Sequence, residues 1–164
     1  MAYLTYAEYQ AISGATAVTE DDFNRLSWLA TKQVENATAG ADNISKLKYC
    51  TPTDPDDLEA VKRCISAIIN LSKDIENAGS MKQTENGLMP SVIASVHAGN
   101  ESITYASSGN ASAVLTASTS QEAKDRLIYS TICDYLKGIT DVNGVNMLYL
   151  GTYPYTIHAE ADNG

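Results

Sequence analysis

The stretch DPDDLEAVKRCISAIINLSKDIENAG, residues 54–79, decides the fold, because it is the longest segment with a helix start, a helical repeat and a helix stop. Asp54 suits the N-cap and Pro55 the first helical position. Apolar side chains recur at helical spacing and form a wide stripe, made by Leu58, Val61, Cys64, Ile65, Ile68, Ile69, Leu71 and Ile75. With Gly79 as the C′ residue, we expect a helix over 55–78, about 36 Å long at about 1.5 Å per residue, covered on more than one side.

Three shorter helical patterns surround this one. Thr5 with Glu8 forms a capping box that opens a helix over 5–12, and Thr19 opens a second helix that runs to about Thr38. A last helix is expected from Thr119 or Ser120 to Lys137, with Gly138 as its C′ residue. The predicted fold class is therefore mainly α, a small helical bundle around a long central helix, with its helical body at 1–79 and 119–138.

The other parts of the chain have a different character. Within 80–118, Val92 to Val96 and Ile103 to Tyr105 read as two strands of a β-hairpin, and 106–119 reads as an exposed, mobile arm of small residues. The C-terminal tail, 139–164, is expected to be extended and contains a short apolar strand at 147–150 that needs a partner strand. At 164 residues the whole chain, 1–164, is predicted to be a single domain.

Composition excludes several classes of function. The net charge of −9 disfavours binding to nucleic acid phosphates or anionic lipid, which are recognised by basic patches. No stretch approaches the roughly 20 apolar residues that span a bilayer, and the first residues do not resemble a signal peptide. The three cysteines are an odd number without CxxC spacing, so we expect reduced thiols in the cytoplasm.

No constellation of residues indicates chemistry. His97 and His158 lack companions at metal-ligand spacing, and the acids at 54–59 are explained by the helix dipole. Asp141-x-Asn143-Gly144 lacks the other ligands of a calcium loop and is predicted to be a turn. No phosphate loop, nucleotide fingerprint or nucleophile elbow is present, so we expect no catalytic, metal or cofactor site and no enzyme. The alternative is an enzyme whose active site is assembled from residues distant in sequence, which no sequence motif would reveal.

The order of the motifs resembles a known family. YLTYAEYQ at 3–10, the Phe-x-x-Leu helix at 19–38, ESITYASS at 101–108, Leu136-Lys137-Gly138 and Leu148-Tyr149-Leu150-Gly151 follow one another as in the head-tail connector (adaptor) proteins of long-tailed bacteriophages. The chain departs from that pattern by inserting TDVNGVN at 140–146 and by its longer, Tyr-rich tail.

The resemblance implies a structural virion protein at the head-tail interface, made in the host bacterial cytoplasm. Such subunits form a ring, usually twelvefold, below the portal protein, extend the DNA channel and provide a platform for a stopper, neck or tail protein. DNA would pass without sequence-specific binding, and neither a cofactor nor a membrane is implied. We expect the interface residues to be Tyr105, Leu148, Tyr149, Tyr153 and Tyr155. The alternatives are a stopper or tail-completion protein of the same neck, usually β-rich, and a non-viral helical interaction module or small enzyme.

Overall fold

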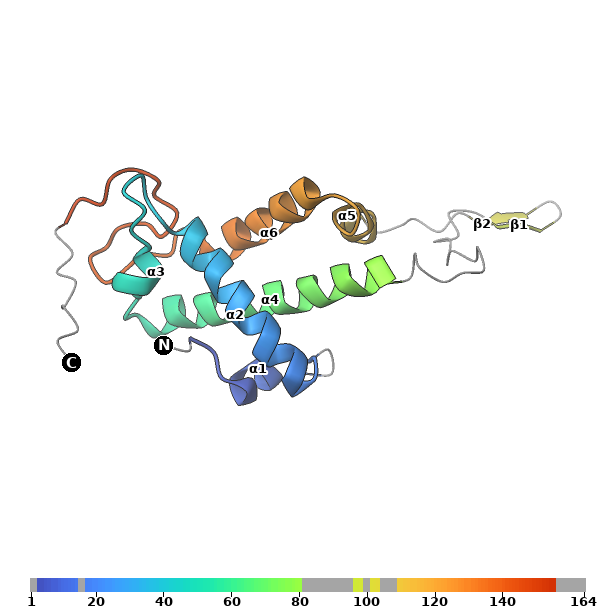
Figure 1. Cartoon of the computed structure of the whole chain (residues 1–164), viewed down its shortest axis with the longest axis horizontal. Helices are drawn as coiled ribbons and strands as arrows, with labels where there is room; N and C mark the ends of the chain where they lie inside the picture. Colours follow the sequence, from blue (N-terminus) through green and yellow to red (C-terminus); the bar gives the residue numbers. More distant parts are fainter. Residues whose placement is uncertain (1–2, 15–16, 81–95, 99–100, 104–108, 156–164) are drawn as a thin grey trace. The chain divides into compact units, whose positions relative to one another are not determined.

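The computed structural model describes residues 3–14, 17–80, 96–98, 101–103 and 109–155. Its helices are α1 (Tyr6–Ser13), α2 (Glu20–Ala37), α3 (Lys46–Tyr49), α4 (Pro55–Ser80), α5 (Gly109–Ala117) and α6 (Gln121–Leu136), and its strands are β1 (Val96–Ala98) and β2 (Glu101–Ile103) (Figure 1). The prediction of a mainly α fold is confirmed.

The contacts within the chain group its residues into two compact units. Unit 1 contains residues 1–70 and 129–164, and unit 2 contains residues 71–128. Helices α4 and α6 each contribute residues to both units, whose boundaries fall at 70/71 and 128/129. The single domain expected from chain length stays a prediction.

The helix starts of unit 1 agree with the sequence. The Thr5 hydroxyl accepts a hydrogen bond from the Glu8 amide, and the Glu8 carboxylate accepts one from the Thr5 amide at 2.8 Å, which completes the predicted capping box. Thr19 caps α2 in the predicted position. Asp54 Oδ1 accepts from the Asp56 amide at 2.9 Å, as expected of an N-cap. Local capping chemistry therefore fixes where these helices begin.

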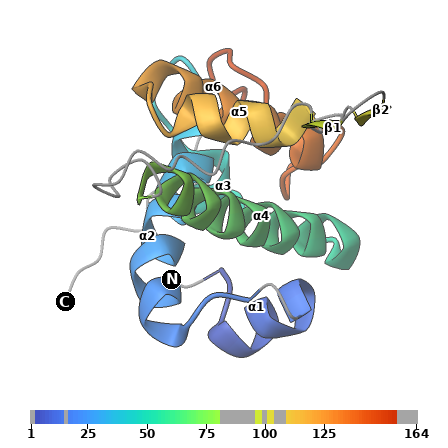
Figure 2. The ribbon, with the colours of Figure 1, turned by 90° about the vertical axis from the view of Figure 1, so that its right-hand side faces the viewer.

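Unit 1 is built around the first half of α4. Tyr9 of α1 lies 5.2 Å from Phe23 of α2 between ring centroids, and both side chains are buried, so α1 and α2 pack together beside α4 (Figure 2). The core draws on every helix of the unit and on the segment after α6: Tyr9, Leu26, Val34, Leu47, Val61, Ile65, Ile68, Ile132, Leu136 and Met147 are each at most 2% exposed. The predicted stripe of α4 is thus covered on more than one side.

Two predictions in unit 2 are wrong. Helix α4 continues through Gly79 to Ser80, and Gly79 lacks the positive φ that a C′ glycine adopts. Residues 109–117 form α5, where a mobile arm was expected. Small residues favour an unstructured arm only where they lack helix propensity, but alanine is the strongest helix former, and Ala117 of α5 is buried.

Strands β1 and β2 pair antiparallel, with Val96 opposite Ile103 and Ala98 opposite Glu101. They fall within the stretch where the sequence predicts a hairpin. The other residues proposed for that hairpin, Val92, Ile93 and Tyr105, lie outside the described residues.

The strand predicted at 147–150 is not formed. The Asn146 side chain accepts from the Leu148 amide at 2.8 Å, and its carbonyl accepts from the Tyr149 amide at 3.0 Å, so the chain turns there. The run therefore needs no partner strand: Met147 is fully buried and its amide donates to the Ile139 carbonyl at 2.9 Å. Among the residues that the structure describes, no helix is long and apolar enough to cross a membrane.

Candidate interaction surface

The segment after α6 is fixed to the loop between α2 and α3; we call residues 139–155 the docked tail. The central contact between the two segments is made by Lys46, which is 1% exposed. The Lys46 ammonium donates to the Thr38 carbonyl at the end of α2, at 2.8 Å, and to the Tyr149 carbonyl in the docked tail, at 2.6 Å. One buried cation thus joins two segments about a hundred residues apart.

Backbone contacts reinforce this tie. Asp42 accepts from the Tyr153 amide at 2.9 Å through Oδ2 and from the Ile44 amide at 3.1 Å through Oδ1. Gly40 and Gly151 approach closely: a Cβ on Gly40 would lie 2.4 Å from the Gly151 carbonyl oxygen. Glycine at position 40 is therefore required for the tail to reach the loop.

A buried polar cluster holds the middle of the docked tail. The Tyr153 hydroxyl donates to Asp141 and accepts from the Asn143 side chain at 2.9 Å. Asp141 Oδ1 also accepts from the amides of Asn143 and Val145, at 2.8 and 2.9 Å, which confirms the predicted turn at 141–144. Gly144 has φ 77°, the left-handed conformation that such a turn needs.

Burial and charge shift the pKa values at this junction. Burial lowers the pKa of Lys46, while the negative charges of Asp42 and Asp141 raise it. The amide of Tyr153, bonded to the Asp42 carboxylate, lowers the pKa of that carboxyl group. Burial, followed by the bond to Asp141, raises the pKa of Tyr153. Burial therefore disfavours the charged form of Lys46, and the nearby negative charges of Asp42 and Asp141 offset part of this effect.

Several large apolar side chains of the docked tail face solvent, although Met147 and Tyr153 are buried. Tyr149, Leu150 and Tyr155 are 48%, 58% and 55% exposed, and Val142 is also exposed. Of the five residues predicted to form an interface, Tyr149 and Tyr155 are exposed and Leu148 is half-buried. Tyr153 is buried and belongs to the core, and Tyr105 lies outside the described residues. Sequence reasoning missed Leu150, although it lies in the quoted Leu-Tyr-Leu-Gly motif.

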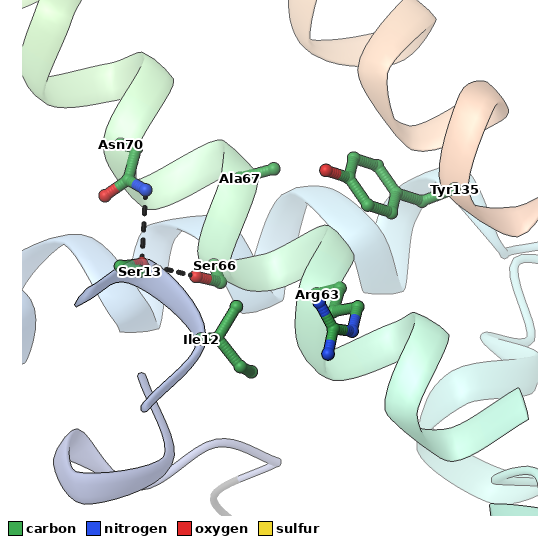
Figure 3. Close-up of a pocket in the computed structure, with 7 residues that line it drawn as sticks. All are labelled: Ile12, Ser13, Arg63, Ser66, Ala67, Asn70 and Tyr135. Atoms are coloured by element: carbon green, nitrogen blue, oxygen red, sulfur yellow. Dashed lines mark hydrogen bonds between the residues drawn. The ribbon is translucent and has the colours of Figure 1, made fainter. Parts of the chain in front are cut away.

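Unit 1 also contains a polar pocket of about 420 Å³ between α1, α4 and α6. It is lined by Ile12 and Ser13 from α1, by Arg63, Ser66, Ala67 and Asn70 from one face of α4, and by Tyr135 from α6 (Figure 3). The Ser13 and Ser66 hydroxyls lie 2.9 Å apart, and the Asn70 amide donates to Ser13 at 3.2 Å. No sequence motif predicted this pocket, because its residues come from three helices.

Within the described ranges, no group of three or more His, Cys, Asp or Glu side chains could hold a metal ion. The side chains of His97 and His158 are outside the described part of the structure. No protein-family model matches the chain, and comparisons with curated proteins and with solved structures also give no match. The docked tail and the polar pocket are therefore interpreted from their own geometry.

Proposed function

We propose that the chain is a head-tail connector of a long-tailed bacteriophage, a structural subunit that forms a ring below the portal protein. In this proposal the subunit is a small helical bundle around α4 with a β-hairpin and a C-terminal tail as its contact elements. The ring extends the DNA channel and carries the next neck or tail protein. The ordered series of short motifs supports the family, and the mainly helical fold favours a connector over a stopper or tail-completion protein, which are usually β-rich.

The observation that carries the proposal is the docked tail. Lys46 and Asp42 bond to the backbone of the tail and Asp141 binds the Tyr153 side chain, and yet Tyr149, Leu150 and Tyr155 face solvent. Protein interfaces are rich in tyrosine, and binding costs less conformational entropy when the contact surface is already ordered. Such a segment is suited to docking on a neighbouring protein, here the portal.

Electrostatics supports a place beside DNA rather than on it. The chain has 20 acidic and 11 basic residues, which gives the net charge of −9. A ring of such subunits repels phosphates, so DNA would pass through the channel without being held. A catalytic role gains no support from the described residues: Asp42 and Asp141 accept hydrogen bonds from backbone amides, and the Ser13 and Ser66 hydroxyls contact each other between α1 and α4.

Point variants test the tail as the docking element. A deletion from residue 147 would remove the buried Met147 and damage the core, so we choose exposed residues instead. The double variant Leu150→Ser and Tyr155→Ser should lose binding to the portal protein encoded near this chain while keeping its helical circular dichroism. Trp28→Ser is the matched control, because Trp28 is 63% exposed on α2. Equal portal binding by the double variant and the wild type would rule out this surface.

A further inference from the structure

The exposed ring of Tyr149 has a fixed position on the docked tail. A Cβ atom on Gly151 would overlap the Tyr149 hydroxyl oxygen and the ring carbon that carries it, and would lie 2.9 Å from ring atom Cε1. The outer end of the ring therefore lies in the space that a side chain at position 151 would fill. At the other end of the residue, Lys46 Nζ donates to the Tyr149 carbonyl at 2.6 Å. The ring is thus held at both ends, although Tyr149 is 48% exposed.

Tyr155 is also held by the tail itself. Its ring packs edge to face on the ring of Tyr153, with 6.0 Å between the two ring centroids. Tyr153 is buried, and its hydroxyl bonds to Asp141 and Asn143. We call the three exposed residues of this stretch, Tyr149, Leu150 and Tyr155, the anchor residues. Because both tyrosine rings are ordered before any partner arrives, they lose little conformational entropy on binding.

The docked tail presents no charged side chain to solvent. Across residues 139–155, all of which the structure describes, the single Asp, Glu, Lys or Arg residue is Asp141, which is buried. Three charged side chains from the rest of unit 1 bond to the backbone of the tail: Lys46, Asp42 and Asp57. The anchor residues therefore belong to an uncharged segment of a chain whose net charge is −9.

We propose that the anchor residues dock into an uncharged groove on the portal protein, lined by aliphatic and aromatic side chains. A strongly charged partner surface would lose its hydration against this segment and find no opposite charge there in return. An apolar groove instead gains from burying two ordered tyrosine rings, which belong to the residue types that dominate binding energy. The inference rests on the proposed function and names the chemistry of the portal surface that receives the tail.

Salt dependence tests whether the contact is uncharged. We would measure binding of the labelled full chain to the portal ring by fluorescence anisotropy at about 0.05 M and about 0.5 M sodium chloride, which compares weak with strong screening of charge. The proposal expects the dissociation constant to change less than about threefold, because burial of apolar surface does not depend on charge. A larger rise with salt would overturn the proposal and indicate a charged partner surface.

A double-mutant cycle tests the Tyr149 ring as a contact held by Gly151. Tyr149→Ala should weaken portal binding about tenfold or more, and Tyr129→Ala, a tyrosine of similar exposure on α6, should not. Gly151→Ala should weaken it about threefold or more, because the added methyl group displaces the Tyr149 ring. In the Tyr149→Ala background, Gly151→Ala should have no further effect, whereas a general disturbance of the tail would weaken binding in both backgrounds.

The outcomes separate this inference from the proposed function. Portal binding that ignores Tyr149→Ala, or an equal effect of Gly151→Ala in both backgrounds, would overturn the inference and leave the connector function in place. A chain that fails to bind the portal would overturn both. Sedimentation of the chain alone provides the last comparison: self-association that Tyr149→Ala abolishes would identify a second copy as the occupant and overturn the portal groove.

Discussion

Replacing Lys46 with methionine should weaken the docking of the tail while leaving the helices in place. Methionine keeps most of the buried stem but removes the ammonium that donates to the Thr38 and Tyr149 carbonyls. The two carbonyls are affected unequally. The Thr38 carbonyl still accepts from the Lys46 backbone amide at 3.2 Å, whereas the bond from Lys46 Nζ to the Tyr149 carbonyl has no such substitute.

Two opposing effects set the free-energy change that Lys46→Met causes in tail docking. A buried carbonyl without its partner costs about 1–3 kcal/mol. Removing a buried ammonium also relieves its desolvation cost, of which Asp42 and Asp141 already offset a part. We expect a net loss of about 1–2 kcal/mol in tail docking, which raises the undocked population roughly 5–30-fold.

Hydrogen-deuterium exchange measures the undocked population of the tail directly. The amides of Met147 and Tyr153, bonded to Ile139 and Asp42, should exchange faster by that factor in Lys46→Met, and those of α1 should not. Lys48→Met is the control, because Lys48 lies in the same helical turn but is exposed. Unchanged protection of the tail in Lys46→Met would refute the reasoning and show that side-chain packing alone holds the tail.

Two further predictions concern unit 1 and unit 2. Hydrogen bonds from Lys62 and Thr5 lower the pKa of Glu8 from 4.5 to about 2. The stabilising effect of Glu8 is therefore fully present above the unfolded value and is lost as pH falls through the folded value. In urea unfolding, Glu8→Gln should cost about 1 kcal/mol at pH 7, because the pair is partly exposed, and clearly less at pH 2. An equal cost at both pH values would contradict this ion pair. Gly40→Ala should destabilise by about 1–3 kcal/mol, because its Cβ would meet the Gly151 carbonyl. Gly79→Ala should stabilise by about 0.5–1 kcal/mol, because Gly79 lies inside a helix and its Cβ would make only an ordinary contact with Ser118 Cβ at 4.0 Å. Thermal unfolding gives both signs, and a neutral Gly40→Ala would show that the tail does not approach the loop.

The helix starts could be predicted because their causes are local. Thr5, Thr19 and Asp54 each accept a hydrogen bond from an amide two or three residues later, and that spacing is visible in the sequence. The buried apolar stripe of α4 could also be predicted from the sequence, because burial follows the helical spacing of the apolar residues. Gly79 misled the prediction because glycine both ends helices and occurs within them, and only its φ decides between the two.

The docked tail could not be predicted, because its ties are distant in sequence. Nothing near Lys46 indicates that its ammonium is buried against Tyr149, 103 residues later. Tyr153 resembles Tyr149 and Tyr155 in the sequence, yet its hydroxyl meets Asp141 and it joins the core, while the other two face solvent. The same limit applies to the pocket, where Arg63 and Tyr135 come from separate helices.

Native mass spectrometry of the chain mixed with the portal protein encoded near it tests the central proposal most directly. The proposal predicts an assembly of portal size that gains about one copy of this chain per portal subunit. With the portal shown to be a ring and the chain shown to be folded, a mixture in which the two stay separate would contradict the connector function. It would instead favour a stopper or a non-viral helical interaction module.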